Sequence, residues 1–187
     1  MSTLAGTGHL EREKGDGSPM KSVGIVMGSA SDASVMEGAI EALREFGVPL
    51  EVRVLSAHRT PDDALAFARD AAGRGIGVLI AGAGKAAHLA GVLAAVTSLP
   101  VIAVPIESGG FGGLDALLAM VQMPPGVPVA TVAVDGARNA GLLAVRILAL
   151  SDEGLADAYR QFRDSMAAKV RAADEGIRAR YAEGAGS

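Results

Sequence analysis

Cysteine and tryptophan are both absent from this chain of 187 residues, and its only aromatic residues are four Phe and two Tyr. Without cysteine the chain can form no disulfide, no thiolate nucleophile and no cysteine-ligated metal site. This composition fits a reducing compartment, so we expect a cytoplasmic protein. Because large rings are scarce, the core has to be built from Ala, Val, Leu and Ile, with closely packed backbones.

An excess of positive charge is also missing. The 17 Lys and Arg residues are outnumbered by 21 Asp and Glu residues, which gives a formal net charge of −4. Proteins that bind nucleic acids attract the phosphate backbone through an excess of basic residues. We therefore expect no nucleic-acid partner.

Long apolar runs without breakers are lacking as well. Residues 1–22 contain no continuous apolar stretch of the kind that a signal peptide needs. Residues 86–106 carry no formal charge and have the length of a membrane span, but Pro100 and Pro105 interrupt them. We interpret this segment as a helix followed by a buried strand, and we expect no membrane partner.

What the chain does contain is a repeated unit of apolar strand, short turn and helix. Half of its residues are hydrophobic, and five apolar runs lack the polar alternation of a half-exposed sheet, which is typical of a parallel sheet between two helical layers. We predict an α/β fold, a three-layer sandwich with a flavodoxin-like parallel sheet in the order 2-1-3-4-5. Thr60 is the predicted cap of the second helix, with Pro61 in its first turn. The predicted strands are 22–27, 50–55, 76–81, 101–106 and 129–134, and the predicted helices 32–46, 61–74, 89–97, 114–123 and 139–151.

A chain of this length is expected to form one domain. We predict a flexible N-terminal tail at residues 1–21 and an α/β catalytic domain at residues 22–151. Residues 152–187 have a helical composition without an apolar run. We expect them to form a C-terminal helix with a frayed end, as part of the same domain or of an oligomer interface.

Three loops are expected to meet at one edge of the sheet. In a parallel sheet, ligands collect beyond the carboxyl ends of the strands, where the strand order reverses. With the predicted order, the loops after the first three strands converge there. Residues 28–32, 56–59 and 82–88 should therefore form one crevice.

The first of these loops carries Ser29, Ser31 and Asp32. Hydroxyl groups and backbone amides at a helix N-terminus can accept a phosphate or another anion. The alternative is ordinary helix capping, with Ser31 or Asp32 as the cap.

The second loop places His58 beside Arg59, directly after a strand. This pair combines a group that titrates near neutral pH with a fixed cation suited to phosphate or carboxylate. Of the three histidines, His9 lies in the tail, while His58 and His88 fall on two of the convergent loops. The alternative is that each is a capping or core histidine bound to a backbone carbonyl.

The third and fourth loops are rich in glycine. Residues 82–88 have small side chains, so a planar ligand could lie against their backbone and a carboxylate could meet their amides. Close packing of helix on sheet would explain the same glycines. Residues 107–113 form either a lid or a turn between subunits, and both interpretations stay open.

Two common classes of active site find no support. The Gly-x-Ser-x-Gly motif of serine hydrolases is absent, and no recognised metal-ligand spacing occurs. One histidine, one aspartate and one arginine instead suit metal-free acid–base chemistry on an anionic, phosphorylated small molecule.

Several ordered motifs resemble the class I PurE family, the N5-carboxyaminoimidazole ribonucleotide mutases of purine biosynthesis. The resemblance extends over residues 23–150. The matching segments are Met27-Gly-Ser-Ala-Ser-Asp32, Ser56-Ala-His-Arg-Thr-Pro61, Ala81-Gly-Ala-Gly84 with Ala86-Ala-His-Leu89, and Val121-Gln-Met-Pro124. It implies an isomerase that moves a carboxylate from the exocyclic nitrogen of the aminoimidazole to ring carbon C4, without metal, nucleotide cofactor or biotin.

The resemblance also implies roles for individual residues. His58 resembles the family's acid–base residue and would handle the C4 proton, while Asp32 resembles the ribose contact. The phosphate contacts would be Ser29, Ser31 and Arg59. The pocket for the imidazole and carboxylate would be lined by Ser56, Ala57, Gly84 and His88, with Lys85 as a further substrate-binding candidate. The family is usually octameric, so we expect a homo-octamer and a small-molecule ribonucleotide substrate.

Two residues depart from the family's pattern. Lys85 stands where the family commonly has Gly, and Ala90 where it commonly has Pro. If the first position requires a positive φ, a lysine is strained there by roughly 1 kcal/mol, although its cation could bind the migrating carboxylate. Two alternatives stay open: an aminoimidazole ribonucleotide carboxylase that uses free carbon dioxide, and a non-catalytic ribonucleotide-binding subunit.

Overall fold

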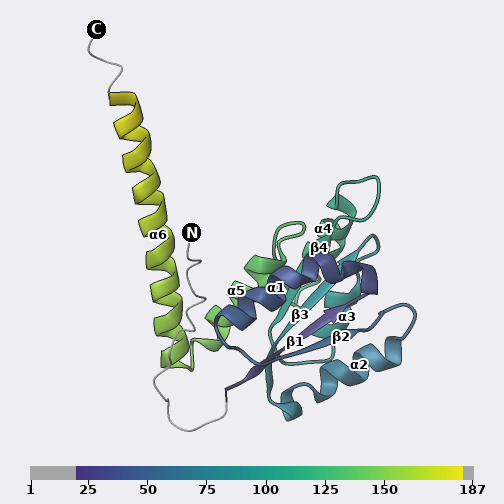
Figure 1. Cartoon of the computed structure of the whole chain (residues 1–187). Helices are drawn as coiled ribbons and strands as arrows, with labels where there is room; N and C mark the ends of the chain where they lie inside the picture. The colour runs from purple at the N-terminus through teal and green to yellow at the C-terminus, as the bar shows by residue number, and fades with distance from the viewer. Residues whose placement is uncertain (1–19, 183–187) are drawn as a thin grey trace, which may run out of the picture.

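A five-stranded parallel sheet forms the centre of the computed structural model, which describes residues 20–182 (Figure 1). The strand order β2-β1-β3-β4-β5 and the α/β fold class confirm the prediction. The strands are β1 (Ser22–Met27), β2 (Leu50–Val54), β3 (Ile76–Gly84), β4 (Val101–Ile106) and β5 (Ala130–Thr131). Nearly every residue of β1, β3 and β4 is buried, because helices cover both faces of the sheet.

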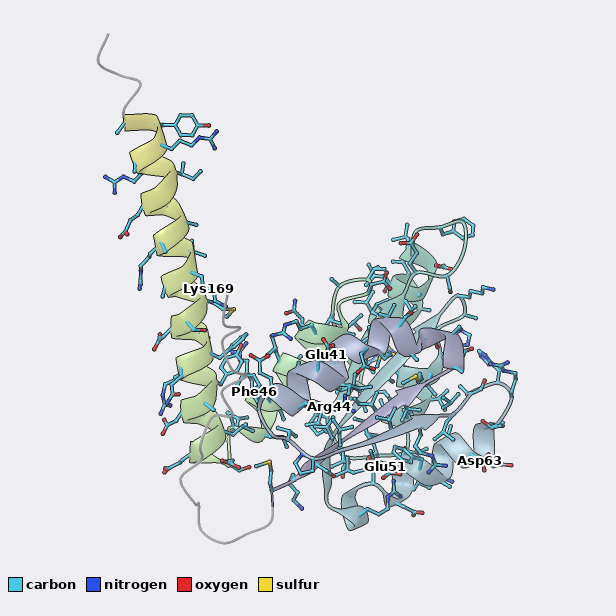
Figure 2. All side chains as sticks on the ribbon, in the orientation of Figure 1. Glu41, Arg44, Phe46, Glu51, Asp63 and Lys169 are labelled. Atoms are coloured by element: carbon cyan, nitrogen blue, oxygen red, sulfur yellow. The ribbon has the colours of Figure 1, made fainter. Side chains whose placement is uncertain are left out.

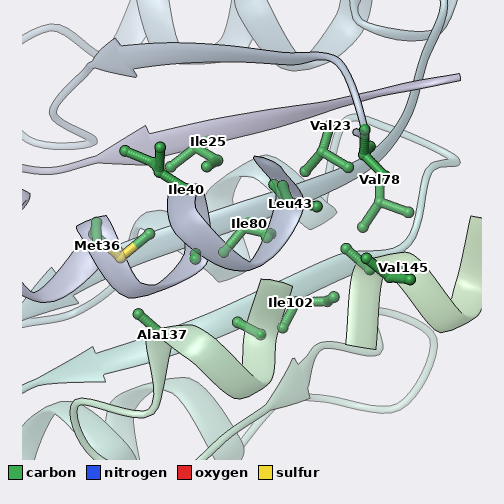
Figure 3. Close-up of a cluster of buried hydrophobic side chains, with 14 of the residues drawn as sticks. Val23, Ile25, Met36, Ile40, Leu43, Val78, Ile80, Ile102, Ala137 and Val145 are labelled. Atoms are coloured by element: carbon green, nitrogen blue, oxygen red, sulfur yellow. The ribbon is translucent and has the colours of Figure 1, made fainter. Parts of the chain in front are cut away.

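Five helices form the two outer layers of the sandwich. On one face, α1 (Ala33–Glu45) and α5 (Ala137–Leu148) pack on Ile25, Ile80 and Ile102 of the sheet. Figure 3 shows part of this cluster, which is built mostly from aliphatic side chains, as the composition requires. The opposite face is covered by α2 (Pro61–Asp70), α3 (Leu89–Ala94) and α4 (Leu114–Val121).

The last helix, α6 (Glu153–Ala182), packs on the sandwich only through its first turns. Phe46 contacts Tyr159 and Phe162 of α6, with ring centroids 5.9 Å and 5.5 Å away. From Arg163 onward the helix is almost entirely exposed and stands away from the domain, as Figure 2 shows around Lys169. The predicted tail at residues 1–21 lies almost wholly outside the described residues, as does the predicted frayed end at residues 183–187.

The uncharged segment 86–106 divides into α3 and β4, as expected. Within residues 20–182, each helix is too short or too polar to cross a membrane.

The prediction for β3 was wrong at its end. The sequence placed a turn at Gly82, whereas β3 continues to Gly84 and pairs Gly82 with Val104 and Gly84 with Ile106 of β4. A Cβ atom at Gly82 would overlap the Met36 side chain, and one at Gly84 would overlap the Ser108 hydroxyl. These glycines therefore allow close approach within a strand, which a turn-based interpretation does not anticipate.

The prediction for β5 was too long. The sequence placed this strand at residues 129–134, but only Ala130 and Thr131 pair with β4. After Val132 the regular pairing stops: the Asp135 amide still donates to the Pro105 carbonyl of β4, but Asp135 adopts a φ of 55° and the Gly136 amide turns back to the Ala133 carbonyl at 2.9 Å. Because β5 is an edge strand, no second neighbour holds this end in the sheet.

Thr60 was correctly placed at the start of α2, but its hydroxyl does not cap the helix. Its Oγ1 accepts a hydrogen bond from the Ser56 amide at 2.9 Å and donates to the Ser56 carbonyl at 3.3 Å. Thr60 therefore stabilises the loop that carries His58, while Pro61 occupies the first turn as predicted.

Two mid-helix glycines allow a matched test of the packing. A Cβ at Gly141 of α5 would lie 2.8 Å from the Ala39 carbonyl oxygen of α1, whereas one at Gly176 of α6 would meet nothing within 4 Å. We expect Gly141→Ala to lower the free energy of unfolding by about 1–3 kcal/mol through overpacking. Gly176→Ala should raise helix stability by about 0.5–1 kcal/mol. Urea denaturation of both variants measures this, and an unchanged or stabilised Gly141→Ala would contradict the observed α1–α5 packing.

Candidate active site

A cavity of about 480 Å³ lies at the carboxyl ends of the first four strands. It is lined by nine of the ten predicted site residues, and the tenth, His88, contacts it through His58. The lining consists of Gly28, Ser29, Ser31, Asp32, Ser56, Ala57, His58, Arg59, Ala83, Gly84, Lys85, Ala86, Leu89 and Ser108. The sequence did not single out Ser108. The available signal was its position at the start of the glycine-rich loop after β4.

The first loop forms a capping box around the short 3₁₀ turn η1 (Ala30–Asp32). The Ser31 amide donates to Ser29 Oγ at 3.3 Å, and the Ser29 amide donates to Asp32 Oδ2 at 3.0 Å. The cap of this 3₁₀ turn is therefore Ser29, while the N-cap position of α1 is occupied by Asp32, one of the two expected caps, whose side chain does not bond to the helix amides. The Ser31 hydroxyl donates to Ser29 Oγ at 2.9 Å, so both hydroxyls lie together on the cavity wall.

Asp32 is the only buried charged residue that the structure describes, with 7 % of its surface exposed. Burial raises the pKa of its carboxyl group, because desolvation penalises the charged form. Hydrogen bonds from Ser29, Ser31 and Gly28, together with the positive charge of Arg59, oppose this rise in pKa. The carboxyl group is thus fixed in place at the base of the first loop.

The second loop is organised by the Ser56 hydroxyl. Ser56 Oγ accepts hydrogen bonds from the backbone amides of His58, at 3.4 Å, and Arg59, at 3.2 Å. The Arg59 guanidinium reaches across to the end of β1, where Nη2 donates to the Gly28 carbonyl at 3.0 Å. This contact places the guanidinium beside the loop that carries Ser29 and Ser31.

His58 and His88 form a pair between the second and third loops. His58 Nε2 and His88 Nδ1 are 2.9 Å apart, and the two rings meet edge to face at 83°. One of these nitrogens must carry a proton and the other accept it, so the two rings share one hydrogen bond. Both side chains are exposed, and neither is a core histidine.

Lys85 occupies a backbone conformation that favours glycine. Its φ is 55°, and its carbonyl accepts a hydrogen bond from the Ala87 amide at 2.8 Å in a tight turn. The left-handed conformation costs a lysine roughly 1–2 kcal/mol. Its side chain is exposed on the cavity wall and forms no ion pair with another described residue. Ala90, the second departure, is buried in α3.

The part of the chain that the structure describes brings no three His, Asp or Glu side chains together in a cluster that could hold a metal ion. The side chains that do converge are two histidines, two cations, a buried carboxyl group and several hydroxyls. They can bind an anion and transfer a proton.

The chain is similar in sequence and in structure to several known proteins. The sequence profile of the AIR carboxylase family matches residues 22–169. The N5-carboxyaminoimidazole ribonucleotide mutase of Mycobacterium leprae is 59 % identical over 152 residues, which cover 81 % of this chain and 89 % of the relative. The phosphoribosylaminoimidazole carboxylase of Schizosaccharomyces pombe is 55 % identical over 144 residues, 77 % of this chain but 26 % of that protein. The crystal structure of Treponema denticola PurE has a TM-score of 0.75 and 30 % identity, over 83 % of this chain and 97 % of the other.

The raised pKa of Asp32 predicts a pH dependence of stability. Because the folded state holds this proton more tightly than the unfolded chain, the aspartate destabilises the fold progressively as the pH rises above the ordinary value of 3.8. Asp32→Asn removes this titration, while its side-chain oxygen can still accept from the Ser29 amide. The unfolding free energy of Asp32→Asn relative to the parent should therefore increase as the pH rises above 3.8.

Urea denaturation at several pH values checks this result. Asp32→Ala serves as the control, because it also removes the acceptor for the Ser29 amide and should be about 1 kcal/mol less stable than Asp32→Asn. A stability difference between parent and Asp32→Asn that does not change with pH would contradict the burial of this carboxyl group.

Proposed function

This chain belongs to the AIR carboxylase family, and we propose that it is an N5-carboxyaminoimidazole ribonucleotide mutase in which His58 is the acid and base. The family profile and the curated mutases confirm the resemblance found in the sequence and the expected isomerase activity. The observation that carries the residue assignments is the 480 Å³ cavity, where His58 lies beside an anion-binding set of groups.

The phosphate is assigned to the side of the cavity formed by β1 and β2. Arg59 is held beside the first loop by its bond to the Gly28 carbonyl, and the hydroxyls of Ser29 and Ser31 are 2.9 Å apart. A fixed guanidinium and paired hydroxyls suit a phosphate monoester. Asp32, at the base of the same loop, is our candidate for the ribose hydroxyls.

The reaction can be written so that one proton suffices. As the bond between nitrogen and the carboxylate carbon breaks, carbon dioxide leaves and the amine nitrogen takes a proton from His58. Carbon C4 then attacks the retained carbon dioxide, and His58 removes the C4 proton as the new carboxylate forms. His58 ends in the state in which it began, so the step requires no external acid or base.

His88 is proposed as a positioning residue for His58. Its Nδ1 lies 2.9 Å from His58 Nε2, so its tautomer determines whether that nitrogen donates or accepts. Ser56, Ala57 and Gly84 complete the wall around the imidazole in this assignment.

A carboxylase activity is the second candidate. The Schizosaccharomyces pombe relative, a carboxylase by name, is almost as similar over the shared segment as the mutases are. Supplying each substrate separately distinguishes the two activities. A rate that follows dissolved carbon dioxide with aminoimidazole ribonucleotide, and not the N-carboxylated substrate, would favour the carboxylase.

We further propose a homo-octamer that works in the cytoplasm. The exposed side chains of Met166, Val170, Ile177 and Tyr181 lie on a part of α6 with little contact to the rest of the described chain. Apolar side chains exposed along one helix suit an interface between subunits. The absence of cysteine supports a reducing compartment.

Replacing His58 tests the assignment of acid and base. His58→Asn should lower kcat for the interconversion of the two carboxylated isomers by at least about 10²-fold, because proton transfer at nitrogen and at C4 is lost. Calorimetry with aminoimidazole ribonucleotide should show binding within a few-fold of the parent, since Arg59 and the serines remain.

The matched variant is His88→Asn, which leaves the proposed acid and base in place. It should lower kcat less than His58→Asn and shift the pH profile of kcat, because His58 Nε2 loses its ring partner. Near-normal turnover of His58→Asn would overturn the assignment. Ligand binding by the parent without any product from either substrate would instead support a non-catalytic subunit.

Light scattering tests the assembly. Eight copies of an 18.8 kDa chain should give a mass of about 150 kDa. Ile177→Glu should lower this mass, because it places a charge in the proposed interface, while Arg178→Glu at the neighbouring position serves as the control for added negative charge. A parent protein that is monomeric at micromolar concentration would contradict the octamer.

A further inference from the structure

Lys85 combines an unfavourable backbone conformation with a charged side chain that has no ion-pair partner among the described residues. Its φ of 55° is a conformation in which a glycine would be relaxed, and its ammonium group forms no ion pair with the other described residues. A charged side chain kept in a strained conformation on a cavity wall points to a function for that side chain in the cavity.

The strain is imposed by the neighbouring backbone. Gly84 packs so closely on Ser108 that a Cβ atom there would overlap the hydroxyl, and the amides of Ala87 and His88 donate to the carbonyls of Lys85 and Ala86 at 2.8 Å and 2.9 Å. The tight turn therefore fixes where the Lys85 side chain leaves the backbone. This point lies three residues before His88, which contacts His58.

The two cationic side chains of the cavity, Arg59 and Lys85, come from loops that follow different strands. Arg59 follows β2 and is bound to the end of β1, whereas Lys85 follows β3 and lies next to the Ser108 loop after β4. Because β1 separates β2 from β3 in the sheet, the two loops begin about 10 Å apart, two strand spacings. This separation suits the two ends of one nucleoside monophosphate.

We propose that Lys85 binds the carboxylate of the substrate beside the histidine pair, and that it is a specificity-determining residue for carboxylated ribonucleotides. This inference rests on the proposed function, which supplies a substrate with two anionic groups. Arg59 and the serines bind the phosphate, and Lys85 binds the second anion, which aminoimidazole ribonucleotide lacks.

The charge balance of the reaction determines which kinetic constant Lys85 affects. The carboxylate is anionic on nitrogen and again on C4, but it passes through neutral carbon dioxide between the two. An ammonium group therefore stabilises the bound substrate and product more than the intermediate. Lys85 should lower KM for both carboxylated isomers without raising kcat.

The test compares Lys85→Gln, which removes the charge and is one atom shorter, with Lys85→Arg, which keeps the charge. In Lys85→Gln, KM for both carboxylated isomers should rise about tenfold, as expected for a lost charge-assisted hydrogen bond, with kcat equal to or above that of the parent. Lys85→Arg should restore most of the affinity. Binding of aminoimidazole ribonucleotide, measured by calorimetry, should stay within about twofold in all variants.

Lys85→Gly separates charge from strain. It should show the same loss of affinity as Lys85→Gln, together with a higher melting temperature, because glycine adopts the positive φ without cost. Equal weakening of carboxylated and uncarboxylated ligands in Lys85→Gln would assign Lys85 to the phosphate and overturn the proposal, as would an unchanged KM.

The two proposals can fail separately. If the parent does not interconvert the carboxylated isomers, the proposed function is wrong. The ratio of affinities for carboxylated and uncarboxylated nucleotide, compared between the parent and Lys85→Gln, then still determines whether Lys85 binds a carboxylate.

Discussion

The close approach of β3 to its neighbours is the constraint on which the site depends. Gly82 lies against the Met36 side chain and Gly84 against the Ser108 hydroxyl, with no room for a Cβ atom at either position. Because β3 can run this far between β1 and β4, its final residues reach the edge where the loops after β1 and β2 also begin. The contact between His58 and His88 follows from this approach, since each ring comes from a different loop.

The charges of the cavity are arranged around one buried carboxyl group. Asp32 is held by the Ser29 amide and lies near the positive charge of Arg59, so the first two loops are joined by polar contacts. Desolvation of this carboxyl group opposes its ionisation, and the hydrogen bonds and the guanidinium offset part of that cost. The Arg59 guanidinium and the hydroxyls of Ser29 and Ser31 are therefore held in fixed positions in the first two loops. A ligand bound to them can place its reacting end next to the histidine pair.

Much of this arrangement could be predicted from the sequence, because it depends on periodicity and on the order of the strands. The apolar runs predict the limits of β1 and β4 correctly, and the rule that ligands collect at the switch point predicts that three loops converge. The details that the sequence did not predict depend on contacts between residues that are distant in sequence or on how a side chain folds back. The sequence predicts a turn at Gly84 because the nearby Ser108 hydroxyl is distant in sequence, and it does not predict η1, whose capping box forms because the Asp32 carboxyl group folds back onto the Ser29 amide.

The exposure of the site suggests a chemical reason for the proposed homo-octamer, which is to cover the cavity. His58, Arg59, Lys85 and His88 are all exposed in the single chain, yet the proposed reaction passes through carbon dioxide, a small neutral molecule that must stay in the cavity until C4 attacks it. Retention requires a cover that excludes water. Phe111, with 75 % of its surface exposed, lies on the glycine-rich loop that begins at the cavity wall with Ser108. Closure by this loop or contact with a neighbouring subunit would each supply the cover, and the second would make assembly a condition of catalysis.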